Sequence, residues 1–259
     1  MTERSEVARG RPQPAVAGLP RPRPTRLWQL ELRGTLARRR ALIIKLAFPL
    51  VLVIPLVTTG APPFFAAMLL TVLIAMVGTV GTGVTVTRAR GSGWLDRLAV
   101  LPLPAWRVGL EIFFAGWLLD CLQATLIFLV LELAQRPDPG ELVSTWLLAM
   151  ATLAFSGAIG LGVATLTDNA GEAMLFLAVI LAPLLFLSGL FTGVPAAGPR
   201  YWVAQVLPFS YLTDGFQLVL GGNPPYGSSV SFLVAAGVFL LVSVAGCAAL
   251  GRFLLERGA

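Results

Sequence analysis

Six long apolar stretches constrain this chain more than any other feature. They lie at about 41–59, 64–87, 107–133, 142–166, 173–192 and 229–251. Each is close to the ~20 residues that an α-helix needs to cross ~30 Å of hydrocarbon. Only 12% of the residues are charged, whereas a soluble domain carries about a quarter. The pattern excludes a water-soluble globule and predicts an all-α integral membrane protein with six transmembrane helices.

The distribution of basic residues predicts the orientation of these spans. Six is an even number, so both termini are expected on the same side of the membrane. The segment before residue 41 has ten basic residues and the 88–107 loop has four, but the opposite face has only Arg136 and Arg200. Because basic loops stay in the cytoplasm, both termini are predicted to be cytoplasmic. The 18 arginines and single lysine are typical of a GC-rich bacterial genome, so we expect a multi-pass protein of a bacterial cell membrane.

A cleaved signal peptide is the alternative interpretation of the first apolar stretch, since Arg38, Arg39 and Arg40 precede it. The stretch is too long for a signal-peptide core, however, and it contains Pro49 and Pro55. Another span follows it almost at once. These features favour a retained, kinked helix.

The N-terminal region divides into two parts. Residues 1–26 are rich in Pro and Arg and have no apolar period, which predicts a disordered cytoplasmic tail. In residues 27–40, Trp28, Leu32 and Leu36 recur at helical spacing among arginines. This favours an amphipathic helix lying along the headgroups, and this helix is expected to begin one transmembrane domain that covers residues 27–259.

The 88–107 loop has its own structural signals. Gly91 and Gly93 end the second span, and Pro102 and Pro104 end a short helix. Trp94, Leu95 and Leu98 would share one exposed face of that helix, next to Asp96 and Arg97. Such a face suits the docking of a soluble partner. The alternative is an interfacial helix that contacts only lipid headgroups.

The external loop between the fifth and sixth stretches, 192–228, is rich in Pro and aromatic residues. Aromatic side chains favour the membrane interface, and residues 191–220 are apolar enough to enter the outer leaflet. The loop therefore predicts a partly re-entrant pair of short helices.

The third stretch contains the most unusual charge, Asp120, near its midpoint, with Gln123 one turn further on. A mid-membrane charge is costly unless it is paired, hydrated or protonated. One interpretation is that both side chains line a cavity between two membrane subunits and contact a polar or cationic part of a ligand. The other is that Asp120 is neutral and hydrogen-bonds a neighbouring helix. Lys45, whose stem can reach the inner interface, and Glu111 are a possible ion pair by depth.

Small residues recur at four-residue spacing in several stretches, including Gly78 with Thr82, Thr79 with Gly83, and Ser156 with Gly160. They suit close helix contacts, although apolar helices are commonly rich in Gly and Ala.

Taken together, the two loops resemble those of the ABC-2 type membrane subunits of ABC transporters. In the cytoplasmic loop the resemblance is carried by Gly93, Leu95, Asp96, Leu98, Pro102 and Pro104. In the external loop it is carried by Ser188, Gly189, Pro199, Trp202, Pro208, Tyr211 and Leu212. The similarity extends over about 27–252.

The resemblance implies an exporter permease that pairs with a second permease and is driven by a separate ATPase subunit. The ATPase would dock on residues 94–104 and on the amphipathic helix, and the cargo would be a drug, antibiotic or lipid-linked amphiphile. The coupling residues implied are Gly93, Trp94, Leu95, Asp96, Arg97, Leu98, Pro102 and Pro104.

The residues themselves exclude several chemistries. A phosphate-binding Walker A loop needs a Gly-Lys pair, and the only lysine, Lys45, has no glycine directly before it. We therefore expect no enzymatic activity, with ATP and Mg used by the partner. The absence of histidine and of metal-ligand spacing excludes metal chemistry, and no nucleic-acid partner is expected. A stand-alone channel or proton-coupled carrier built on Asp120 is the alternative function, and a lipid enzyme is disfavoured because no catalytic cluster converges.

Overall fold

The structure is a computed structural model that describes residues 27–37, 39–99, 103–194, 197–224 and 229–256. These residues form ten helices and no strand. The helices are α1 (Leu27–Ala37), α2 (Arg39–Thr58), α3 (Pro63–Gly91), α4 (Trp94–Ala99), α5 (Ala105–Gln135), α6 (Pro139–Leu166), α7 (Ala170–Leu187), α8 (Pro199–Val206), α9 (Pro208–Val219) and α10 (Ser229–Glu256). The predicted tail, 1–26, lies outside the described residues.

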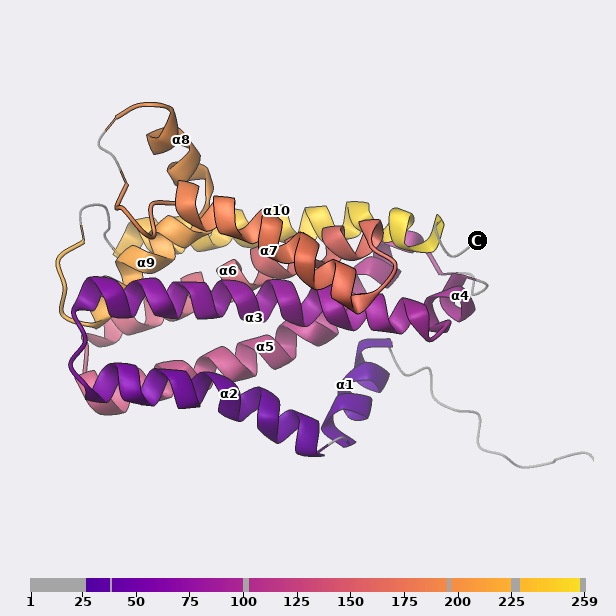
Figure 1. Ribbon diagram of the computed structural model, residues 1–259, viewed down its shortest axis with the longest axis horizontal. Coiled ribbons are helices and arrows are strands. Elements are labelled where there is room, and N and C mark those ends of the chain that lie inside the picture. The colour runs from indigo at the N-terminus through magenta and orange to yellow at the C-terminus, as the bar shows by residue number, and fades with distance from the viewer. Residues whose placement is uncertain (1–26, 38, 100–102, 195–196, 225–228, 257–259) are drawn as a thin grey trace, which may run out of the picture.

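The long helices run in the same general direction and form one bundle (Figure 1). Five described helices are long and apolar enough to cross a membrane: α3, α5, α6, α7 and residues Ser231–Leu254 of α10. The first predicted span becomes α2, whose apolar part, Leu42–Thr58, is shorter. The all-helical prediction is confirmed with five candidate spans, and a sixth crossing by α2 stays a prediction.

One predicted boundary that differs is the end of the fifth stretch. We expected it to continue to residue 192, but α7 ends at Leu187. Gly189 follows with φ +86°, and a side chain there would meet the backbone of Gly193 and Val194. A left-handed glycine ends the helix because the other residues rarely adopt this conformation.

Close helix packing centres on α6, which lies against α3 and α10. A side chain in place of Gly78 would overlap Ser156, and one in place of Gly160 would overlap the backbone of Thr79 and Gly83. The predicted small-residue pattern therefore marks a real contact in which the α3 and α6 backbones approach closely.

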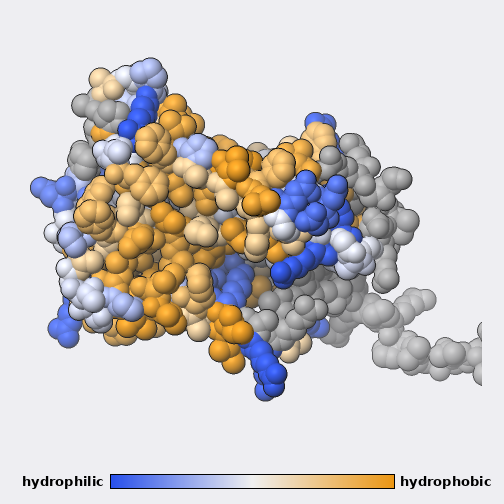
Figure 2. Space-filling view, in the orientation of Figure 1, coloured by the Kyte–Doolittle hydropathy of each residue, from blue (hydrophilic) through white to orange (hydrophobic). Residues whose placement is uncertain are grey.

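The outer surface of the bundle is apolar. Large exposed hydrophobic side chains include Ile44 of α2, Leu175 of α7 and Leu241 of α10. Figure 2 shows an apolar band across the middle of one face, with hydrophilic side chains gathered towards both ends. Exposed apolar surface of this extent needs a nonaqueous environment, which a bilayer supplies.

Side-chain caps explain where two of the helices begin. The Asp138 carboxylate accepts hydrogen bonds from the backbone N–H groups of Gly140 and Glu141 at the start of α6. At the start of α7, Asn169 accepts from Glu172 N–H, and the Glu172 carboxylate accepts from Asp168 N–H. Asn169 and the Glu172 carboxylate thus cap the start of α7.

Candidate functional site

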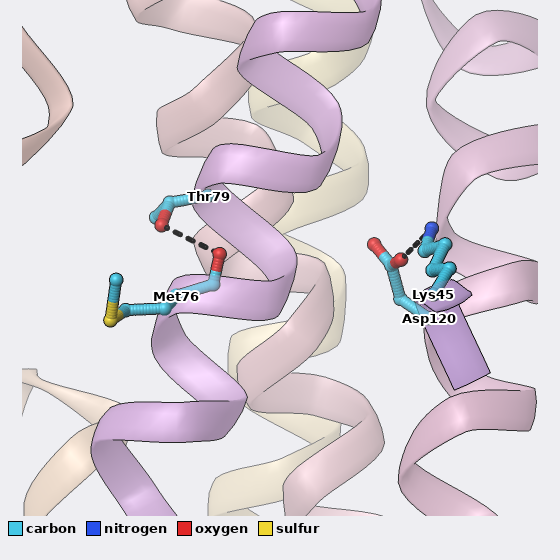
Figure 3. Close-up of polar contacts among 4 residues, drawn as sticks. All are labelled: Lys45, Met76, Thr79 and Asp120. Carbon is cyan, nitrogen blue, oxygen red and sulfur yellow. Dashed lines mark hydrogen bonds and ion pairs between the residues drawn. The ribbon is translucent and has the colours of Figure 1, made fainter. Parts of the chain in front are cut away.

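An ion pair joins α2 to α5 inside the bundle. The Lys45 Nζ atom donates to Asp120 Oδ1 at 2.6 Å, and the two side chains are 31% and 2% exposed (Figure 3). Gly81 of α3 faces the carboxylate, since a side chain there would come within 3.4 Å of Asp120 Oδ2. Three helices therefore enclose the carboxylate, and Lys45 provides its countercharge.

This pairing corrects the expectation for Lys45. Glu111 is the possible partner of Lys45 by depth in the sequence, but Glu111 accepts a hydrogen bond from Arg107 Nε at 2.7 Å, one turn earlier in α5. A buried carboxylate is much costlier than one near the interface, so the lysine is placed where it offsets the larger cost. A single lysine in the first apolar stretch and a single mid-span acid in the third were the signals available.

Gln123 lies one turn after Asp120 and is 3% exposed. Its Oε1 atom has no hydrogen-bond partner among the described residues. A buried acceptor without a partner costs about 1–3 kcal/mol, so this amide is a candidate for contact with a ligand.

A groove of about 590 Å³ lies between α2 and α3, and the Gln123 side chain lines its base on α5. Its walls are almost entirely aliphatic and aromatic, apart from Lys45 and Gln123. Asp120 is not among the lining residues. Asp120 and Gln123 lie one turn apart on α5, but only Gln123 borders the groove, and the role of either side chain in a substrate path stays a prediction.

The short helix α4 forms where the sequence of the 88–107 loop predicts one. Gly93 adopts φ +68°, which turns the chain sharply after α3. Asp96 and Arg97 lie within α4, Pro104 precedes α5, and Pro102 lies outside the described residues.

The expected exposed apolar face on α4 is wrong. Leu95 and Leu98 are only 1% and 5% exposed and pack in a cluster with side chains of α3, α5, α6 and α10, while Trp94 is partly buried against it. Packing the two leucine side chains of this six-residue helix against the bundle is more favourable than leaving them exposed to water. The helix is anchored to the bundle, and a docking surface on this segment must use other side chains.

A basic side chain near α4, that of Arg90, also makes hydrogen bonds within the chain. The Arg90 guanidinium donates to the carbonyl oxygens of Ala164 and Thr167, at 2.5 and 3.0 Å. These carbonyls belong to the end of α6, where a positive charge is favoured. Arg90 therefore connects α3 to α6 next to α4.

The N-terminal helix α1 lies across the direction of the long helices, beside α5 (Figure 1). The Trp28 ring packs edge-on against Phe114 with centroids 5.7 Å apart. Trp28 and Leu32 are partly buried, whereas Leu36 is exposed. The predicted helix to residue 40 ends at Ala37, and Arg39 and Arg40 belong to α2.

The loop between α7 and α10 contains two short helices, α8 and α9, as expected for a helix pair. Pro199 and Pro208 occupy the first positions of these helices, where the missing N–H costs nothing. The Ser188 hydroxyl donates to Leu185 O, and the Tyr211 hydroxyl donates to Gln205 Oε1 at 2.7 Å. Trp202 is 70% exposed on α8, and the depth of this pair in a membrane stays a prediction.

Sequence reasoning missed Asp214, which lies buried in α9 where that helix contacts α3 and α6. Burial raises the pKa of the Asp214 carboxyl to about 7. The pKa of Tyr211, one turn earlier, is also raised, mainly by burial and then by Tyr201 and Asp214. The lone acid in an otherwise apolar segment was a signal for this site.

An all-helical bundle with an apolar exterior, five candidate spans and a buried ion pair defines a polytopic membrane protein. Residues 27–220 match the ABC-2 type transporter family. The chain belongs to this family and is a membrane subunit of the ABC transporter type.

Two curated relatives are similar over part of the chain. They are the proteins described as "Probable multidrug ABC transporter permease YbhR" from Escherichia coli K12 and from Escherichia coli O157:H7. Each is 27% identical over 151 residues, a segment that covers 55% of this chain and 40% of the relative. The similarity therefore spans less than half the length of these relatives.

Proposed function

We propose that this chain is the permease subunit of an exporter that is driven by a separate ATPase. Six crossings, including α2, would place both termini in the cytoplasm of a bacterial cell, and a second permease would complete the translocation path. The cargo would be an amphipathic drug, an antibiotic or a lipid-linked molecule. The name of the similar proteins, which describes multidrug permeases, supports this class of cargo.

The anchored helix α4 is the observation that carries the proposal. It stands between the end of α3 and the start of α5, and its two buried leucines attach it to α10 as well. A rigid lever can transmit a movement that a loose loop would absorb. An ATPase that moves the 94–104 segment would therefore act on several spans at once.

ATP and Mg belong to the partner in this proposal. The sequence has one lysine, Lys45, and it lies in an apolar helix without the glycines of a phosphate-binding loop. Energy would reach this chain only through α4 and through α1. Arg33 lies in α1, and Arg39 and Arg40 lie just after it.

The proposed cargo path includes Asp120 and Gln123. Both lie on α5 towards the middle of the bundle, next to the groove between α2 and α3. The unpartnered amide oxygen of Gln123 supports a role in contact with the cargo.

The test is reconstitution with a soluble ATPase that copurifies with the permease in detergent. Transport of an amphipathic dye into liposomes should require both the ATPase and ATP. Transport by the permease alone, with nucleotide withheld, contradicts the proposal.

A Trp94→Ala variant tests the lever. Trp94 is partly exposed, so its removal should leave the buried Leu95 and Leu98 anchor in place. We expect transport to fall at least about tenfold, a change of about 1.4 kcal/mol in coupling, while membrane insertion is unchanged. Trp202→Ala, on exposed α8, is the matched control. Normal transport by the Trp94 variant would reject the lever.

The Lys45–Asp120 pair favours one alternative, a proton-coupled carrier or channel. That function predicts transport which persists without an ATPase and changes with pH. Liposome assays at two pH values, with the ATPase omitted, separate the two.

A further inference from the structure

The groove between α2 and α3 has one polar end in an otherwise apolar lining. Phe48 and Leu52 of α2 and Leu69 and Leu73 of α3 form much of its walls, and Lys45 and Gln123 supply its polar groups. Figure 2 shows hydrophilic surface inside the apolar band, just above α2. Its volume of about 590 Å³ is in the range of small-molecule sites, about 300–1,000 Å³.

Two groups at this end have hydrogen-bonding capacity left over. An ammonium carries three N–H donors, and Lys45 gives one of them to Asp120 within the described residues. The Gln123 amide lines the groove and its Oε1 atom has no partner. A ligand group that both accepts and donates would satisfy the two side chains together.

The charge of this end restricts the ligand. Lys45 and Asp120 sum to zero, and the ammonium is the more exposed partner. A cation would be repelled by Lys45, and an anion would compete with Asp120 for it. A neutral hydroxyl or amide meets neither penalty, and an alkyl chain matches the walls.

We propose that this groove binds a neutral, single-chain amphiphile whose hydroxyl or amide group hydrogen-bonds with Gln123 and Lys45. The proposal rests on the transport function proposed above, because the occupant is the cargo. It narrows that cargo from amphiphiles in general to uncharged ones.

The test uses the purified permease in lipid nanodiscs, without an ATPase, labelled by a photoreactive dodecanol that carries a diazirine. Dodecan-1-ol and dodecane compete for the label. The Gln123→Met variant should raise the half-competing concentration of dodecan-1-ol about tenfold and leave that of dodecane unchanged. Comparing variant and unchanged protein for each competitor cancels differences in membrane partition. Dodecyltrimethylammonium should compete worse than dodecan-1-ol in the unchanged protein.

A groove-filling variant keeps the test decisive if Gln123→Met does not fold. Leu69→Trp, at an exposed wall position, should abolish labelling, and Leu175→Trp on the outside of α7 should not. Labelled peptides should come from α2, α3 and α5. Equal effects of Gln123→Met on both competitors, or labelling elsewhere, overturns the proposal.

Occupation by a second copy of the chain is the opposing result. Met76 lines the groove and is exposed. A Met76→Cys variant that lacks Cys121 and Cys247 should form no disulfide-linked dimer on oxidation in membranes. A disulfide-linked dimer would place a permease copy over the groove and overturn the proposal.

The two proposals fail separately. If the competitors behave as expected but transport proceeds without nucleotide, only the ATPase-driven function fails. If transport needs ATP but Gln123→Met leaves competition unchanged, only the groove assignment fails.

Discussion

The two flanks of α3 differ in how tightly they are packed. On one side, glycines bring the α3 backbone into contact with α6, and α10 packs on α6 in turn. On the other side, α2 rests mainly on α5 and leaves the groove open against α3. The side of α3 that packs on α6 is the tight flank, and the side that borders the groove with α2 is the loose flank. One bundle thus combines a rigid side with a side that can admit a ligand.

The largest expected effect comes from breaking the tight flank with Gly160→Leu. The new side chain would overlap the backbone of Thr79 and Gly83, which cannot rotate away. We expect a loss of stability above the ~1–3 kcal/mol that overpacking usually costs. The measurement is the monodisperse yield and melting temperature in detergent.

Gly237→Leu is the control for this variant, because nothing lies within 4 Å of a side chain there on α10. It should be neutral or slightly stabilising. Equal behaviour of the two variants would mean that the flanks do not differ as described.

The second effect tests the ion pair on the loose flank. Lys45→Met leaves the nearly inaccessible Asp120 without a countercharge and should cost about 3–5 kcal/mol. Asp120→Asn should cost less, because the partly exposed ammonium can still reach water. Thermal unfolding of both variants and of Lys45→Met with Asp120→Leu measures the asymmetry.

In the double variant both charges are gone, so much of the loss should be recovered. A double variant no more stable than Lys45→Met alone would show that the pair does not act as a unit.

The smallest effect concerns Asp214, which is buried in α9 where that helix contacts α3 and α6. Its pKa rises from 3.8 to about 7 on folding, so the folded protein holds the proton more strongly than the unfolded chain. This contribution to stability is complete below pH 4 and disappears as the pH rises through 7.

Asp214→Asn should therefore melt higher than the unchanged protein at pH 8 and show little difference at pH 4. Each kcal/mol corresponds to about 2–4 °C in a chain of this size. Melting curves from pH 4 to 8 provide the measurement, and a constant difference across that range would place the carboxylate in water.

The sequence predicted much of the fold because apolar length and charge distribution are local properties. The long helices, the short helix after Gly93 and the helix pair before α10 follow from them. The contact between Gly78 and Ser156 was also foreseeable, since small residues at four-residue spacing mark close helix pairs.

The site was less predictable because it depends on which helices become neighbours. Spacing placed Gln123 near Asp120, but nothing local indicated that α2 would bring Lys45 to the carboxylate. The burial of Leu95 and Leu98 likewise depends on α10, which is more than 130 residues further along the chain. Tertiary neighbours decide these features, and local patterns do not encode them.

The two prolines inside α2 bear on how its wall of the groove can move. A proline at position 49 deprives the carbonyl of residue 45 of its usual helical donor, and Pro55 does the same for residue 51. One of these two missing hydrogen bonds lies in the turn that carries the Lys45 ammonium group. If α2 bends, it would bend at this turn. The bend would lengthen the ion pair between Lys45 and Asp120.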